Sequence, residues 1–317
     1  MTAVSSAPVA VIDIGSNSIK ALVARRGADG GLKEISSNVI DARIGAGISR
    51  EQPRLSEEGM ARGLEAIREL AAGAAAGGAA RLIVVATSAV RDAANGADFR
   101  ERVRAAIGAD LRILTGEEEA GLIGRGLLSD PALRGKSDFT VCDLGGGSLE
   151  CVAFKGRRVR AQVSLPLGCV RLTERFVADP TAPVPADTLT AVATHVRATL
   201  GASGFTFTPP GAKELIGTGG TISTARRIVG RRQGLRFVES DPAVPLPVLR
   251  ALLAEVAASP LAVRSEMPGL AAARADVFPA ALATVVAVLE YAGAVSFRHS
   301  LRNLRHGVAA EALGVGV

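Results

Sequence analysis

The chain has 317 residues, which is long for one compact domain and enough for two, since domains mostly contain about 100 to 150 residues. Its 48% hydrophobic and 21% charged residues are typical of a globular protein and exclude global disorder or a small disulfide-stabilised fold. The excess of 37 Lys and Arg over 31 Asp and Glu favours a polyanionic ligand, although an Arg-rich, Ala-rich chain can equally reflect genomic composition. Aromatic residues are only 3%, so base stacking on nucleic acid is not expected.

Targeting and metal signals are weak in this sequence. The first basic residue, Lys20, follows the first apolar run, which argues against a secretory signal. The longest apolar run, Val277 to Leu289, contains Pro279 and is shorter than the ~20 residues that cross a bilayer, so it predicts a buried core helix. The cysteines and histidines show no metal-ligand spacing. We therefore expect a reduced, cytoplasmic protein without a membrane segment, nucleic-acid partner or Cys/His metal site.

The first half of the chain shows strands alternating with capped helices. Apolar runs at 9–14 and 19–24, separated by a Gly-Ser-Asn turn, predict two strands in a hairpin. Ser56 is the expected N-cap of a helix that ends in the Gly/Ala tract 71–80, and 81–87 predicts a buried parallel strand. A strand at 111–114 precedes a second helix, in which Thr115 and Glu118 have the spacing of a capping box. A linker is expected at 129–137.

The second half repeats the opening pattern. Runs at 139–144 and 149–154 flank a glycine turn, and aligning DIGSNSIKALVA with DLGGGSLECVAF places Asp13 on Asp143 and Ser18 on Ser148. Such a long-range repeat indicates duplicated domains. A third glycine turn at 217–221 follows a short strand at 214–216. We expect surface loops at the Pro-rich stretches 180–185, 209–210 and 242–247, and helices from Leu261 onward.

A strand that ends in Asp, followed by small residues and a second strand, suits a phosphate-binding loop. Small residues let the backbone approach a phosphate, and the backbone amides donate hydrogen bonds to it. A single glycine hairpin often only reverses the chain. Two matched copies and a third Gly/Thr turn favour binding of a phosphorylated ligand.

Seven ordered motifs resemble those of one known family. They are VIDIGSNSIKALVA, VVATSAVRDAANGADF, TGEEEAGLIGRGL, DLGGGSLE, LPLGCVRLTERF, GTGGTISTA and ARADVFPAA, between about residues 9 and 310. The paired loops resemble the actin-like phosphotransferase superfamily, and the full set resembles the exopolyphosphatase and guanosine pentaphosphate phosphohydrolase (Ppx/GppA) family. The resemblance implies an α/β fold of two actin-like, ribonuclease-H-like lobes with a central cleft. Residues 1–129 and 302–317 would form lobe I and residues 130–301 lobe II, and the chain would end where the shorter family members end.

The resemblance also implies catalytic roles that the residues alone leave open. Taken alone, acids at 117–119 are better explained by the macrodipole of the helix that they begin, but Glu119 matches the residue that activates water in the family. Arg91, which by itself resembles a surface charge, matches an arginine that contacts phosphate. Asp143 and Glu150 match acids associated with Mg²⁺, a cation that prefers carboxylates, waters and phosphates, although Glu150 alone could be a solvated strand residue.

The expected phosphate contacts lie in the three glycine loops and one later arginine. They are Asp13, Ser16, Asn17, Ser18, Gly145, Gly146, Gly147, Ser148, Gly219, Gly220, Thr221 and Arg274, with weaker support for Arg171. Two positions depart from the family pattern: Gly121 replaces a common Arg and His306 replaces a Glu. The first would weaken one phosphate contact, and the second is distant in sequence from the acidic triad.

The predicted function is Mg²⁺-dependent hydrolysis of the terminal phosphoanhydride of inorganic polyphosphate. Guanosine pentaphosphate is the alternative substrate, and an actin-like kinase or ATP-binding scaffold is the alternative from another class. A kinase must exclude water from its site, whereas a hydrolase must activate it. The position of Glu119 therefore favours a hydrolase, and release of phosphate from polyphosphate without an acceptor would distinguish a hydrolase from a kinase. Homodimers are common in the family; chain-length preference and oligomeric state stay open.

Overall fold

The computed structural model describes residues 7–316, which divide into two compact units. The first unit contains the residues up to Arg134 and those from Arg302 onward, and the second unit contains Gly135–Leu301. The expected boundary at 129/130 differs from this division by a short 3₁₀ helix, η1 (Pro131–Leu133), which lies in the first unit. Residues 1–6 and 317, which the sequence analysis assigned to lobe I, lie outside the described residues.

The first unit contains a five-stranded sheet in the order β3-β2-β1-β4-β5. Its strands are β1 (Val9–Ile14), β2 (Ile19–Arg26), β3 (Leu32–Ile40), β4 (Arg81–Ala86) and β5 (Leu111–Ile113). β1 to β3 form antiparallel pairs, whereas β1, β4 and β5 are parallel. The predicted hairpin and buried parallel strand are thus confirmed, and the edge strand β3, which is mostly exposed, was not predicted.

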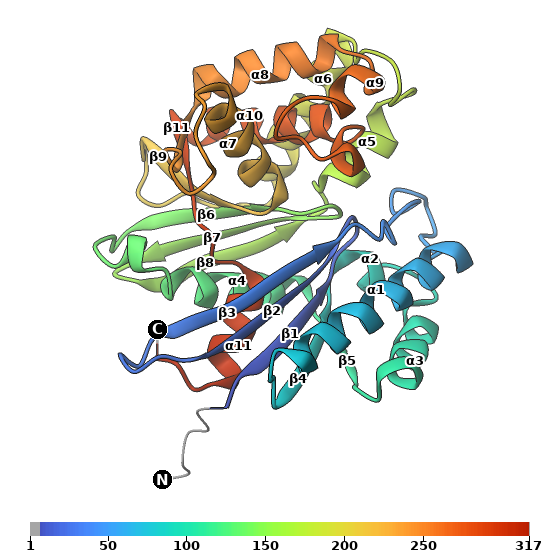
Figure 1. Cartoon of the computed structure of the whole chain (residues 1–317). Helices are drawn as coiled ribbons and strands as arrows, with labels where there is room; N and C mark the ends of the chain where they lie inside the picture. The colour runs from blue at the N-terminus through green and yellow to red at the C-terminus, as the bar shows by residue number, and fades with distance from the viewer. Residues whose placement is uncertain (1–6, 317) are drawn as a thin grey trace. The chain divides into compact units, whose positions relative to one another are not determined.

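Helices cover both faces of this sheet, with α1 and α3 on one side and α4 and α11 on the other (Figure 1). They are α1 (Glu57–Ala76), α2 (Ser88–Arg91), α3 (Gly96–Ile107), α4 (Gly116–Leu128) and α11 (Leu304–Ala312). The Ser56 hydroxyl accepts a hydrogen bond from the Gly59 amide at the start of α1. The helix starts predicted at Ser56 and Thr115 are both confirmed. Such caps can be predicted from the sequence because they depend only on residues within one helical turn.

The last helix packs against α4 through backbone. A Cβ on Gly307 would lie 1.8 Å from the carbonyl oxygen of Leu122, and one on Gly126 would lie 2.2 Å from that of Asn303. No side chain fits at either position, so the two helices approach each other as closely as backbone allows. The end of the chain therefore holds the helix that begins with the acidic triad.

The second unit repeats the topology of the first and adds one edge strand, in the order β10-β11-β9-β6-β7-β8. Its strands are β6 (Phe139–Leu144), β7 (Leu149–Lys155), β8 (Arg158–Leu165), β9 (Glu214–Thr218), β10 (Ala243–Pro245) and β11 (Ser296–His299). β6 to β8 are antiparallel neighbours, and β6, β9 and β11 are parallel. The order β8-β7-β6-β9-β11 matches β3-β2-β1-β4-β5, which agrees with the duplication expected from the loop repeat.

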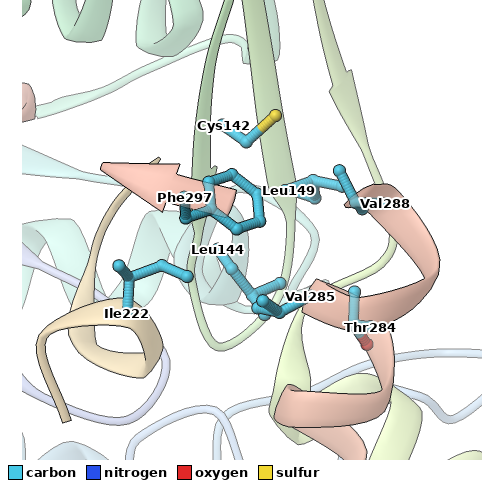
Figure 2. A pocket seen from close by; sticks show the side chains of 8 residues that line it. All are labelled: Cys142, Leu144, Leu149, Ile222, Thr284, Val285, Val288 and Phe297. Carbon is cyan, nitrogen blue, oxygen red and sulfur yellow. The ribbon is translucent and has the colours of Figure 1, made fainter. Parts of the chain in front are cut away.

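The core of the second unit is aliphatic and centred on α10 (Phe278–Ala292), whose residues 278–289 are all buried. The other helices are α5 (Cys169–Phe176), α6 (Ala186–Ala202), α7 (Gly220–Arg232), α8 (Leu246–Ala258), α9 (Leu261–Ser265) and the 3₁₀ turn η2 (Ala272–Arg274). A cavity of about 10 Å³ between α10, α7 and the sheet is lined by Thr284 and seven apolar side chains, among them Val285 and Phe297 (Figure 2). Within residues 7–316, no helix has the length and apolar character needed to cross a membrane.

Three local expectations in the second unit were wrong. The stretch 242–247 is not a loop but contains β10 and the start of α8, because proline is compatible with an edge strand and with the first turn of a helix. The tail from Leu261 contains β11, whose four residues are too few to show a clear period. The turn expected at 217–221 is also different: Gly217 and Thr218 belong to β9, and Gly220 begins α7.

Candidate active site

The acidic triad of α4 places its carboxylates in different environments. The hydroxyl of Thr115 accepts a hydrogen bond from the Glu118 amide, and the Glu118 carboxylate accepts one from the Thr115 amide at 2.8 Å. Arg112 also donates to Glu118, so this exposed acid has a structural role. Glu119 is only 6% exposed and takes no part in the capping box. The structure therefore separates the capping acid from the acid expected to act in catalysis.

Glu119 forms an ion pair with Arg91, the other residue expected to be catalytic. The Arg91 Nη1 atom donates to Glu119 Oε2 at 2.8 Å and to the Leu114 carbonyl oxygen at 3.1 Å. Its Nε atom lies 3.4 Å from Asp92 Oδ1. Arg91 ends α2, which directly follows the parallel strand β4. The sequence motifs singled out both residues but contained no signal that they pair.

The first hairpin loop is held by its own backbone and by the segment after β3. The Gly15 amide donates to the Ser18 carbonyl at 3.2 Å, and the Gly45 amide donates to the Ser16 carbonyl at 2.8 Å. Ser16, Asn17 and Ser18 are all buried. The Ser16 hydroxyl oxygen lies 3.4 Å from that of Ser88, at the start of α2. The loop and the helix with Arg91 thus meet at one edge of the sheet, where parallel strands place ligand sites.

Two buried polar atoms at this edge have no partner among the described residues. They are Oδ1 of Asp13, at the end of β1, and Nδ2 of Asn17, whose Oδ1 accepts from Arg43 at 3.4 Å. Burial raises the pKa of Asp13, an effect that the charges of Lys20 and Arg305 oppose. Buried polar groups are nearly always hydrogen-bonded, so these atoms are suited to a ligand or water.

The loop of the second unit has the same construction. The Gly145 amide donates to the Ser148 carbonyl at 3.0 Å, and the amide of Val170 donates to Gly146 at 2.8 Å. A Cβ on Gly168 would lie 2.3 Å from the Gly146 carbonyl oxygen, so this close approach requires glycine. The Nε atom of Arg171 donates to the Gly147 carbonyl at 3.0 Å, which indicates that this arginine supports the loop.

Asp143 and Glu150 lie directly opposite each other on β6 and β7. Opposite residues of an antiparallel pair project from the same face of the sheet, about 5 Å apart at Cβ. Glu150 is 2% exposed, and its Oε1 accepts a hydrogen bond from the Ser164 hydroxyl at 2.7 Å. The pair fits a hard cation with oxygen ligands. Since residues 7–316 contain no group of three potential His, Cys, Asp or Glu ligands, waters and phosphate would complete such a site, as Mg²⁺ prefers.

The third glycine segment forms the N-terminus of α7 beside Asp143. Gly219 has a φ of 89°, and a Cβ there would lie 2.4 Å from Asp143 Oδ1. A Cβ on Gly220 would lie 2.5 Å from the Arg274 guanidinium. Thr221 is fully buried, and its Oγ1 and the Nε of Arg274 have no partner among the described residues. A helix N-terminus with a cation and an unpartnered hydroxyl is suited to bind a phosphoryl group.

Cys142, Cys151 and His306 form structural contacts within their units. Cys142 and Cys151 lie opposite each other with their sulfurs 3.7 Å apart in the core, where the hydrogen bond between them and burial raise the pKa of Cys151. His306 belongs to the capping box of α11, and its Nε2 lies 3.1 Å from Glu34 Oε2. Gly121 lies in the first half of α4.

Each unit thus gathers its own set of the expected residues. The first unit brings Arg91 to Glu119 and Ser16 to the helix that carries Arg91. The second unit brings Asp143 to Glu150 and Gly219 to Asp143. Sequence reasoning missed the supporting groups, namely Ser88, Ser164, Gly45 and Gly168. The two glycines could have been recognised from the sequence as equivalent positions, because Gly45 and Gly168 each follow the third strand of their unit.

Comparison with known proteins connects these sites to a family. The model of the Ppx/GppA phosphatase family matches residues 22–314. An exopolyphosphatase from Cytophaga hutchinsonii superimposes with a TM-score of 0.84 at 22% identity, over 98% of this chain and 99% of that chain. The Aquifex aeolicus Ppx/GppA family member gives 0.77 at 26% identity, over 97% and 98%. An exopolyphosphatase-like protein gives 0.84 at 26% identity, over 96% and 97%.

These similarities confirm the expected fold class, a mixed α/β fold with two sheets shared with solved Ppx/GppA structures. They extend over nearly the whole of this chain and of its relatives. The chain therefore belongs to the Ppx/GppA phosphatase family and is a phosphoanhydride hydrolase.

Proposed function

We propose that the protein hydrolyses the terminal phosphoanhydride bond of inorganic polyphosphate and releases orthophosphate in a Mg²⁺-dependent reaction. The observation that carries this proposal is the environment of Glu119. Its carboxylate is buried, oriented by Arg91 at 2.8 Å, and not used by the capping box of its helix. A carboxylate held in this way suits a general base that orients and deprotonates water.

Each group has a separate role in the proposed reaction. Glu119 takes the proton of the attacking water, and the hydrogen bond from Arg91 orients that carboxylate. The backbone amides of the loops at 15–18 and 145–148 and the N-terminus of α7 are each suited to bind phosphoryl oxygens of the substrate.

Asp143 and Glu150 are the proposed residues for holding Mg²⁺. Their opposite positions on β6 and β7 and the burial of Glu150 support this assignment. When bound, the cation would offset negative charge that develops on the phosphoryl oxygens. Asp13 occupies the equivalent position to Asp143 in the first unit and is proposed to face the phosphate chain.

Two features favour polyphosphate over guanosine pentaphosphate. The positive charge, 37 Lys and Arg against 31 Asp and Glu, favours a long polyanion, and the 3% aromatic content offers few rings for stacking a base. The similarity to exopolyphosphatases of known structure agrees with this choice.

The test compares Glu119→Gln with Glu118→Gln as its matched control. With polyphosphate, Mg²⁺ and neither nucleotide nor acceptor, the wild type should release orthophosphate. Glu119→Gln should lower turnover by roughly 10²- to 10⁴-fold with substrate affinity within a few-fold, since a general base acts mainly on the transition state. Glu118→Gln should be much milder. Equal damage in both variants would refute the assignment of the base, and a requirement for an acceptor would indicate a kinase.

A further inference from the structure

One face of α7 carries a row of arginines that begins at the proposed phosphate-binding turn. Seven and eleven residues correspond to about two and three turns of a helix with 3.6 residues per turn, so Arg227 and Arg231 lie on the same face as Gly220. The guanidinium of Arg274 lies against Gly220 at the start of this row. The three arginines thus extend from the N-terminus of α7 along its length, ~16 Å to Arg231.

We propose that Arg227 and Arg231, together with Arg274, form a distal subsite that binds the internal phosphates of a polyphosphate chain. The inference rests on the proposed function, since it assumes that a phosphoryl group occupies the N-terminus of α7. Beyond the proposed function, the inference gives the path of the internal phosphates along α7. It also assigns the preference for long chains to Arg227 and Arg231.

The arginines of this row have no acidic partner among residues 7–316, in contrast to arginines elsewhere in the chain such as Arg62 and Arg100. Arg232, the next residue, forms an ion pair with Glu255 at 2.7 Å. Arg226, on another face of α7, donates to the carbonyls of Phe237 and Ser240. By contrast, Arg227, Arg231 and Arg274 form no side-chain hydrogen bond or ion pair with any residue of the described range 7–316. Their charges are available to a ligand.

The row is also electrostatically unfavourable without an anion. The pKa of Arg227 is lowered by burial and then by the charges of Arg274 and Arg231, with no acid acting in the opposite direction. The guanidinium of Arg227 lies 5.5 Å from the centre of the Phe237 ring, which holds it without neutralising it. A polyanion would relieve the repulsion of all three groups, and guanidinium groups bind phosphate oxygens in a bidentate manner.

The surrounding structure supports this face as a fixed surface. A Cβ on Gly269 would lie 3.0 Å from the Ile228 amide nitrogen, so the segment that leads to Arg274 packs directly on α7 beside Arg227. The buried and unpartnered Oγ1 of Thr221 provides a separate indication of a ligand at the start of the row. A short phosphate chain bound at Gly220 ends before Arg231, whereas a long chain reaches it.

The experiment uses Arg227→Gln and Arg231→Gln, with Arg232→Gln as the control that removes the same charge from the same helix end. Steady-state rates are measured on tripolyphosphate and on long-chain polyphosphate at several salt concentrations. Arg231→Gln should raise KM for the long chain about three- to tenfold and KM for tripolyphosphate much less. The slope of log affinity against log salt should fall by about one for each arginine removed. Arg232→Gln should match the wild type.

Equilibrium binding of the same polyphosphates to these variants in the Glu119→Gln background separates the two proposals. If the wild type hydrolyses polyphosphate but Arg227→Gln and Arg231→Gln bind it like Arg232→Gln, the distal subsite is wrong. If length-dependent binding requires both arginines but no phosphate is released by the wild type, the proposed function is wrong and the subsite stands. Equal competition by single-stranded RNA would overturn the subsite by identifying the face as a nucleic-acid surface. Arg231 is exposed, so this variant remains informative if Arg227→Gln does not fold.

Discussion

Replacing Arg91 by Gln should destabilise the fold more than replacing its partner Glu119 by Gln. The side chain of Glu119 is 7% exposed and that of Arg91 is 22% exposed, so the carboxylate is the more deeply buried member of the pair. Removing the cation takes away the ion-pair partner of a buried carboxylate, for which the cost in other proteins is about 3 to 5 kcal/mol. We expect a value at the lower end of this range, about 3 kcal/mol, because the Arg91 side chain is partly exposed to solvent.

Glu119→Gln should lower the free energy of unfolding by only about 1 kcal/mol. Arg91 keeps its hydrogen bond to the Leu114 carbonyl and its contact with Asp92, and it is partly solvated. The double variant should be more stable than Arg91→Gln alone, since removing the second charge removes the desolvated anion. Both single variants should lose activity, but only Glu119→Gln should lose it with little change in the free energy of unfolding.

Urea unfolding followed by circular dichroism measures these differences, and rates of phosphate release are recorded in parallel. Arg100→Gln is the control, because Arg100 pairs with Asp110 on the surface and its loss should leave the free energy of unfolding nearly unchanged. If Arg91→Gln and Glu119→Gln cost the same, or if their effects simply add in the double variant, the reasoning from a buried, coupled pair is refuted.

Three further predictions concern the metal, the pH dependence of stability and the helix contact. Asp143→Asn should raise the Mg²⁺ concentration for half-maximal rate and weaken Mg²⁺ binding by calorimetry, and Glu150→Gln should do so less; unchanged binding in both would remove them from the metal site. Burial lowers the pKa of His306 to about 4 from 6.5, so the folded state binds fewer protons than the unfolded state. About 3 kcal/mol of stability should therefore be lost as the pH falls from 6.5 to about 4, and urea titrations of His306→Gln should lack this part; the same loss in the variant as in the wild type would contradict the assignment to His306. Gly307→Ala should cost several kcal/mol, since the new Cβ would overlap backbone, whereas Gly73→Ala, with open space, should stabilise α1 by about 0.5 to 1 kcal/mol; equal thermal midpoints would contradict the close helix contact.

Local patterns in the sequence determined the parts of the fold that depend on neighbouring residues. The capping box at Thr115 and Glu118 formed as expected, because both partners lie within one helical turn. The hairpins around Gly15 and Gly145 also formed, since a strand, a tight turn and a second strand are encoded in about 15 residues. Their repetition correctly indicated two units of the same topology.

The tertiary structure decided which distant side chains meet. Arg91 and Glu119 come from separate motifs, and only the packing of α2 beside α4 makes them an ion pair. Arg274 reaches Gly220 for the same reason, across a segment that no periodic pattern connects to α7. Short strands such as β11 were likewise missed, because four residues carry too weak a pattern and become a strand only through pairing with β9 and β10. The periodicity of a sequence predicts which face of a single helix or strand is buried. It does not predict which charged side chains meet in one site, because those contacts form between elements that are far apart in the sequence.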